Sequence, residues 1–102
     1  MIKHVNSEKE FDELVKEGKV LVDFFATWCG PCRMLAPNLE QLDADPTFEP
    51  QIIKVDVDEV ESLAIRYQVS SIPTLLYFVD GEIKNKGLGF MRKDQLIDFC
   101  NK

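Results

Sequence analysis

Residues 20–32 read Val20-Leu-Val-Asp-Phe-Phe-Ala-Thr-Trp-Cys-Gly-Pro-Cys32. The first part, residues 20–26, is almost continuously apolar and rich in β-branched and aromatic side chains, which predicts a central strand buried on both faces. Pro31 then suits the first turn of a helix, because proline lacks an N–H that the first turn would leave unpaired anyway. The chain therefore passes from a buried strand into a helix at Cys29, with Cys32 one turn further along.

A cysteine at the start of a helix is placed to act as a nucleophile. Unpaired backbone N–H groups and the positive end of the helix dipole favour the thiolate and lower the pKa of a cysteine there. Cys32, three residues on, is close enough to form a disulfide with Cys29 and is expected to be the less exposed of the two. We predict that Cys29 attacks, that Cys32 resolves, and that the pair cycles between dithiol and disulfide.

The same two cysteines could instead form half of a zinc site. Zinc usually takes four ligands, commonly two such pairs. The remaining candidates, Cys100 and His4, are each far from the pair in sequence, so we expect no bound metal. Cys100 lies in an apolar helical pattern with Leu96 and Phe99, which favours a buried or half-buried small hydrophobe over a regulatory thiol.

Strand-like and helix-like segments alternate on either side of this stretch. A capping box from Ser7 to Glu10 starts a first helix, which Gly18 terminates. The later predicted elements are a strand at 51–57, a helix capped by Asp58-x-x-Glu61, strands at 74–79 and 82–88, and a helix at 93–100. Asp80-Gly81 supplies the positive-φ positions of a type I′ hairpin turn between the last two strands. This order predicts an α/β fold with a mixed sheet and helices on both faces.

Composition narrows the possible environments and partners. The chain has 102 residues, enough for one domain, and no apolar run reaches the roughly 18 residues that span a bilayer. A formal net charge of −6 argues against nucleic acid as a partner, because such binding needs a basic surface. The opening residues lack the apolar region of a signal peptide, so we expect a cytoplasmic protein. In that reducing compartment a C-x-x-C pair is typical of catalysis rather than of a structural disulfide.

Several motifs together resemble those of the thioredoxin family. They are residues 22–32, Ile72-Pro73-Thr74 about forty residues later, the Asp80-Gly81 turn and Gly89. The resemblance runs over nearly the whole chain. It implies a single domain over residues 1–102, with a central mixed sheet of about five strands flanked by about four helices on both faces. Phe25 stands where many members carry a second tryptophan, a departure expected to affect packing and fluorescence more than chemistry.

Asp23 is the one carboxylate in an otherwise apolar strand. Burial would raise its pKa toward the range of proton exchange at neutral pH. The residues alone leave open whether local hydrogen bonds satisfy it instead. The resemblance implies that Asp23 lies behind the cysteine pair and helps to deprotonate Cys32 through water. Lys54 matches the lysine that the family places near this carboxylate and would modulate its proton, although strand lysines are usually just solvated.

The resemblance also implies a surface that binds substrates. A cis Ile72-Pro73 bond would turn the backbone of Ile72 toward the cysteines, where it could pair with an extended substrate segment. The residues of this surface are Trp28, Gly30, Pro31, Ile72, Pro73 and Gly89. Plain core packing for Trp28 and a strand bulge at Gly89 are the alternatives.

The implied activity is that of a general protein-disulfide reductase with the catalytic set Cys29, Cys32, Asp23 and Lys54. Its partners would be diverse disulfide-containing proteins and a flavin-containing thioredoxin reductase, which passes on electrons from NADPH. No cofactor would be bound to this chain, which we expect to be a monomer. Two alternatives stay open: a dithiol oxidant or isomerase, against which the Gly30-Pro31 spacer argues, and a non-catalytic binding subunit.

Overall fold

A computed structural model describes residues 1–101 of the chain, and within them five strands form one sheet covered by four helices. The strands are β1 (Lys3–Val5), β2 (Lys19–Phe25), β3 (Gln51–Asp56), β4 (Thr74–Val79) and β5 (Glu82–Leu88). The helices are α1 (Glu8–Val15), α2 (Gly30–Ala44), α3 (Glu61–Arg66) and α4 (Lys93–Phe99). These elements confirm the predicted fold class.

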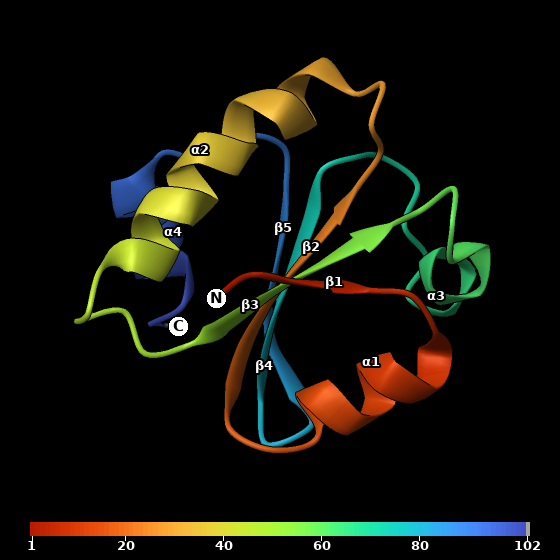
Figure 1. The fold of residues 1–102 in the computed structure, drawn as a ribbon, viewed down its shortest axis with the longest axis horizontal. Coiled ribbons are helices and arrows are strands. Elements are labelled where there is room, and N and C mark those ends of the chain that lie inside the picture. The colour runs from red at the N-terminus through yellow and green to blue at the C-terminus, as the bar shows by residue number, and fades with distance from the viewer. Residues whose placement is uncertain (102) are drawn as a thin grey trace.

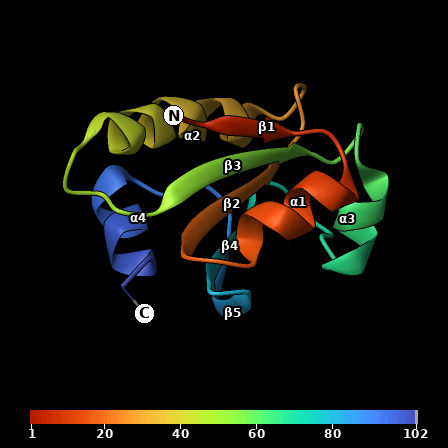
Figure 2. The same ribbon diagram turned by 60° about the horizontal axis from the view of Figure 1, so that its bottom comes forward.

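The strand order in the sheet is β1-β3-β2-β4-β5, so the apolar strand β2 lies at its centre. Strand β2 pairs with β3 in parallel and with β4 in the antiparallel direction, which makes the sheet mixed. Figure 2 shows β1 and β5 at opposite edges. The predicted elements include no strand at β1, because three residues are too few for a periodic pattern.

Alternate residues of β2 enter two separate cores. Val20, Val22 and Phe24 pack with residues of α1 and α3 on one face of the sheet. Leu21 packs with residues of α2 and α4 on the other face. Figure 1 shows these two helix pairs on opposite sides of the sheet. Because side chains alternate along a strand, Asp23 and Phe25 project from the same face as Leu21, toward α2.

The start of α1 and the β4–β5 turn follow the predicted local chemistry, except for the donor to Glu10. Ser7 accepts a hydrogen bond from the Glu10 backbone N–H at 3.1 Å, as a capping box requires. The Glu10 carboxylate accepts in turn from the Asn6 N–H at 2.9 Å, one residue earlier than the motif predicts. Asp80 and Gly81 adopt φ values of 49° and 87°, which confirms the predicted turn.

Helix α3 begins later than predicted, and the prediction that Asp58 caps it is wrong. Its N-cap is Val60, with no side-chain cap hydrogen bond. The preceding residues form a turn around Asp56, whose carboxylate accepts from the Asp58 N–H at 2.8 Å and whose carbonyl accepts from the Val60 N–H at 2.9 Å. Asp58 lies inside this turn, so its side chain does not cap α3.

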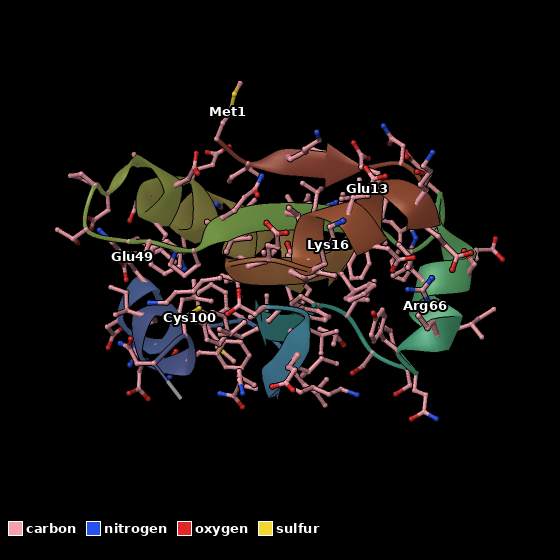
Figure 3. All side chains as sticks on the ribbon, turned by 90° about the horizontal axis from the view of Figure 1, so that it is seen from below. Met1, Glu13, Lys16, Glu49, Arg66 and Cys100 are labelled. Atoms are coloured by element: carbon pink, nitrogen blue, oxygen red, sulfur yellow. A yellow bond between two sulfur atoms is a disulfide. The ribbon has the colours of Figure 1, made fainter. Side chains whose placement is uncertain are left out.

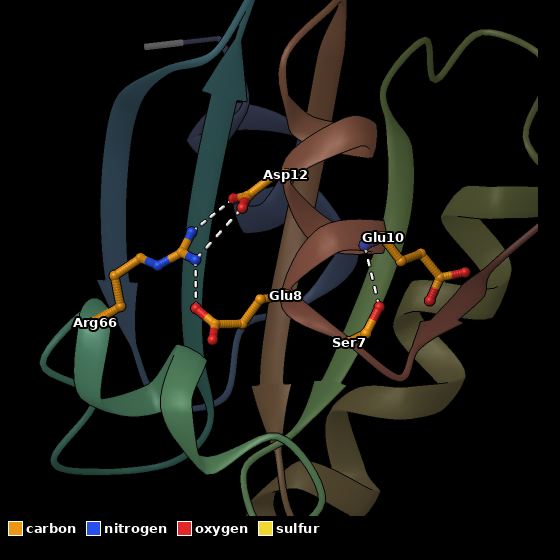
Figure 4. Close-up of polar contacts among 5 residues, drawn as sticks. All are labelled: Ser7, Glu8, Glu10, Asp12 and Arg66. Carbon is orange, nitrogen blue, oxygen red and sulfur yellow. Dashed lines mark hydrogen bonds and ion pairs between the residues drawn. The ribbon is translucent and has the colours of Figure 1, made fainter.

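Helices α1 and α3 are joined by an ion-pair cluster at the surface. The guanidinium of Arg66, at the end of α3, pairs with Asp12 at 2.6 Å and with Glu8, both on α1 (Figure 4). These partners raise the pKa of Arg66 above its already high ordinary value, and the hydrogen bond with Asp12 contributes most. The cluster ties together two helices that cover the same face of the sheet.

Cys100 lies at the end of α4, in the core between that helix and the sheet (Figure 3). It is 7% exposed, and burial raises the pKa of its thiol to about 12. The thiol therefore stays protonated at neutral pH. Its burial confirms the prediction of a buried or half-buried small hydrophobe at this position. In the described part of the chain, the helices are all too short or too polar to cross a membrane.

Candidate functional site

The cysteine pair lies where β2 gives way to α2. Cys29 is the N-cap of α2, and its Sγ accepts a hydrogen bond from the Cys32 backbone N–H at 3.2 Å. The two cysteines form a disulfide with their Cα atoms 5.2 Å apart. Cys29 is 5% exposed and Cys32 2%, so the difference has the predicted direction but is small. The N–H that points at Cys29 Sγ is the kind of donor that stabilises a thiolate once the disulfide is reduced.

The segment before β4 approaches this pair from the side. The Ile72-Pro73 peptide bond is cis, as the resemblance implied, and the Ile72 carbonyl oxygen lies 3.7 Å from Cys29 Sγ. Gly89, at the end of β5, has φ of +85° and donates its N–H to the Pro73 carbonyl at 2.8 Å. This hydrogen bond places Gly89 beside the cis proline, and a positive φ is one that side-chain-bearing residues rarely adopt.

Trp28 precedes the cysteines and stands in solvent. It is 67% exposed, which excludes the alternative of core packing. Its indole N–H donates to the Asp58 carboxylate at 2.8 Å, across a separation of 30 residues. Asp58 is therefore a site residue that the sequence analysis missed. The available signal was Trp28 itself, because an indole N–H usually finds an acceptor.

The other residues of the predicted substrate surface lie on three segments near Cys29: the start of α2, the loop before β4 and the residue after β5. Gly30 and Pro31 form the first turn of α2, where Pro31 is exposed and Gly30 half-buried. Ile72 and Gly89 are half-buried, while Pro73 is buried.

Asp23 lies on the α2 side of β2 and is completely buried. Burial raises the pKa of its carboxyl to about 7, and the positive charge of Lys54 opposes that rise. Lys54 Nζ is 4.0 Å from Asp23 Oδ2. Among residues 1–101, no group donates a hydrogen bond to either carboxylate oxygen, so the alternative of local satisfaction does not hold. An acid with this pKa can accept or release a proton at neutral pH.

The candidate zinc ligands do not come together. Cys100 is in the core under α4, while His4 is on β1 against the ring of Phe25. Within the described residues 1–101, no group of three or more histidine, cysteine, aspartate or glutamate side chains could hold a metal ion.

A disulfide pair that begins a helix directly after the central strand of a mixed sheet is the arrangement of a thiol–disulfide oxidoreductase. The family model described as Thioredoxin matches residues 2–102. The thioredoxin of Staphylococcus aureus is 49% identical over 96 residues, which cover 94% of this chain and 92% of that protein.

Solved structures give the same result. A mutant thioredoxin from Halobacterium salinarum superposes with a TM-score of 0.89 at 40% identity, covering 98% of this chain and 88% of that one. Plasmodium falciparum thioredoxin gives a TM-score of 0.86 at 38% identity, with 94% and 96% covered. The chain therefore belongs to the thioredoxin family.

Proposed function

We propose that this chain is a general protein-disulfide reductase that acts through the Cys29-Cys32 dithiol. The observation that carries the proposal is the position of Cys29: it caps α2, accepts the Cys32 N–H, and lies 3.7 Å from the backbone carbonyl oxygen of Ile72. A thiolate there is stabilised by the helix start and can meet an extended segment of a protein substrate.

The reaction has two exchange steps. The Cys29 thiolate attacks one sulfur of the substrate disulfide, forming a mixed disulfide and releasing the other substrate sulfur as a thiolate, which takes a proton from solvent. Cys32 then loses its proton with the help of Asp23 and attacks Cys29 Sγ, releasing the second substrate thiol. The dithiol gives up two electrons, and the substrate disulfide accepts them.

The remaining roles follow from this mechanism. Trp28, Gly30, Pro31, Ile72, Pro73 and Gly89 would form the surface that receives the substrate chain. Lys54 would adjust the proton affinity of Asp23, from which it is 4.0 Å away. A cytoplasmic thioredoxin reductase would return the disulfide to the dithiol with electrons from NADPH, so this chain needs no bound cofactor. The protein would act as a monomer of one domain.

Reduction of insulin, followed in the presence of NADPH and a bacterial thioredoxin reductase, tests the proposal. We expect turnover with the natural chain and none with Cys29→Ser. Cys32→Ser should accumulate mixed disulfides with substrates, whereas accumulation in Cys29→Ser would mean that the two roles are reversed. Equal, slow turnover by the natural chain and Cys29→Ser would refute the reductase function and leave a binding role.

A further inference from the structure

We propose that Phe25 is a positioning residue for the proton transfer assigned to Asp23, because the face of its ring holds the Lys54 ammonium beside the carboxylate without letting it form a hydrogen bond there. This inference rests on the proposed function, in which Asp23 helps to deprotonate Cys32. The sequence analysis expected this residue to affect packing and fluorescence more than chemistry.

The sheet register brings the groups together. Lys54 on β3 pairs with Asp23 on one side and with His4 on the other. Paired residues of adjacent strands project from the same face, so these three side chains form a row. Phe25 is two residues beyond Asp23 on β2 and therefore projects from that face as well.

The distances show that Lys54 is shared between two partners. Its Nζ is 4.3 Å from the centre of the Phe25 ring and 4.0 Å from Asp23 Oδ2. Its side chain is 12% exposed, so water offers the ammonium little compensation, and an aromatic face attracts a cation more strongly when it is partly desolvated. Because 4.0 Å exceeds hydrogen-bond length, the interaction with Asp23 is coulombic only.

The position of Lys54 decides how strongly Asp23 holds its proton. Burial raises the pKa of the carboxyl to about 7 against the opposing charge of Lys54. An ammonium hydrogen-bonded to Asp23 would lower that pKa and weaken the carboxylate as a base. An ammonium withdrawn into solvent would raise it, so that Asp23 would stay protonated at neutral pH. The ring of Phe25 holds the ammonium between these two limits.

The other groups on this face around Lys54 are an aromatic ring, a carboxylate and an apolar side chain. His4 on β1 meets the Phe25 ring edge-on, with ring centres 6.0 Å apart. Asp56 lies opposite Phe25 in the register and shares the face of Lys54, while β4 places the uncharged Leu75 opposite Asp23.

Helix α2 covers this region with Cys32 and the charged Arg33. These two residues, with Phe25 and Lys54, line a cavity of about 230 Å³. Without the ring, Lys54 can swing into this cavity toward water, because an ammonium is strongly hydrated. We therefore expect loss of the ring to raise, not lower, the pKa of Asp23.

A double-mutant cycle tests this coupling. Phe25→Leu removes the aromatic face and keeps an apolar side chain, Phe25→Trp keeps a face, and Lys54→Gln removes the cation. The first readout is the pKa of Asp23 from a ¹³C NMR pH titration of its carboxyl. The second is the pH dependence with which Cys32 releases thionitrobenzoate from a preformed mixed disulfide on Cys29.

We expect Phe25→Leu to raise the pKa of Asp23 by about half a unit or more, and to move the pH midpoint of release with it. Phe25→Trp should keep the natural value, and Phe25→Leu should have no effect once Lys54 is glutamine. Phe48→Leu, at a ring that lines a separate cavity, is the matched control and should leave the pKa unchanged.

If Phe25→Leu raises the pKa of Asp23 by the same amount in the Lys54→Gln background, the inference is overturned. The ring would then act only by excluding water from the carboxylate. If the pH dependence of the release rate does not follow the pKa of Asp23 in any variant, the proposed role of Asp23 is refuted, and the inference with it. A measurement on the natural protein needs no variant to fold: the Lys54 Hε resonances should be shifted upfield by the ring, and unshifted resonances would also overturn the inference.

Discussion

Trp28 and Asp58 are joined by a hydrogen bond of 2.8 Å between the indole N–H and a carboxylate oxygen. The bond fixes the orientation of an exposed ring directly before Cys29. It connects the cysteine loop to the turn before α3. The acidic residue of that turn therefore belongs to the site, although it is distant in sequence.

The first prediction is that Asp58→Ala frees the Trp28 ring with little loss of stability. The bond is exposed, so its removal should cost under about 1 kcal/mol of unfolding free energy. Trp28 is the only tryptophan, so its fluorescence anisotropy decay reports the ring alone. The decay should become faster and disulfide reduction a few-fold slower, whereas Glu59→Gln, which removes a neighbouring charge, should leave both unchanged. A ring equally rigid in Asp58→Ala would show that the bond does not orient it.

The second prediction concerns Arg66, which joins α3 to Glu8 and Asp12 on α1 (Figure 4). Arg66→Met should lower the unfolding free energy by about 1 kcal/mol, since exposed ion pairs contribute little unless several act together. The loss should shrink in about 1 M salt, where charges are screened. Urea unfolding at both salt concentrations measures it.

Arg92→Met is the matched control for Arg66→Met. Arg92 pairs at 3.1 Å with Asp94, two residues away, and so joins no separate elements. At low salt, Arg92→Met should lower the unfolding free energy less than Arg66→Met does. If the two variants lose the same unfolding free energy, the link that the Arg66 cluster makes between α1 and α3 does not add to stability.

Local rules were enough to predict most of the fold. The apolar run of β2, the Ser7 cap and the Asp80-Gly81 turn each depend on residues close together in sequence, and all three are present in the structure. Strand β1 was not predicted from the pattern because its three residues carry no usable periodicity. Its place at the sheet edge depends on pairing with β3, far along the chain.

Local sequence likewise predicted only part of the candidate site. The position of Cys29 as a helix cap followed from Pro31 and the preceding strand. The partner of Trp28 and the row formed by Asp23, Lys54 and His4 depend on register between strands, which a single sequence does not specify. The cis bond before Pro73 was expected only from the resemblance, because most X-Pro bonds are trans.

The third prediction is that Gly87→Ala destabilises the protein through a packing clash. A Cβ at residue 87 would lie 2.5 Å from Met91 Cε and 2.9 Å from Phe99 Cε1. The flexible methionine can move aside, but the packed ring cannot easily do so, and overpacking of this kind costs about 1–3 kcal/mol. Chemical denaturation measures the loss.

Gly30→Ala provides the comparison for Gly87→Ala. Apart from its chain neighbours and the backbone of its own helix, no atom of residues 1–101 lies within 4 Å of a Cβ built there, and the residue is in the first turn of α2. Its effect on unfolding free energy should be neutral or slightly stabilising, because alanine restricts the unfolded chain more than glycine does. A Gly87→Ala variant as stable as Gly30→Ala would mean that β5 and α4 separate without cost.

The fourth prediction is that stability falls with rising pH because of Asp23. The pKa of this carboxyl is raised from 3.8 to about 7 by burial in the folded state. Between these values the folded state keeps the proton and the unfolded state has lost it, so unfolding releases a proton and becomes more favourable as pH rises. The slope approaches about 1.4 kcal/mol per pH unit midway between the two pKa values and is smaller near each of them, so the folded state loses about 3 kcal/mol between pH 4 and pH 7.

Asp23→Leu should remove this pH dependence, because leucine fills a similar space without a charge. Its unfolding free energy relative to the natural chain should therefore increase steadily from about pH 4 to about pH 7 and level off above the folded-state pKa. Denaturant unfolding of the disulfide form over this pH range measures the difference. Glu13→Gln, at an exposed acid on α1, should follow the natural chain. A stability difference that is constant with pH would mean that Asp23 is ionised in the folded protein throughout, stabilised by Lys54 more strongly than their 4.0 Å separation implies.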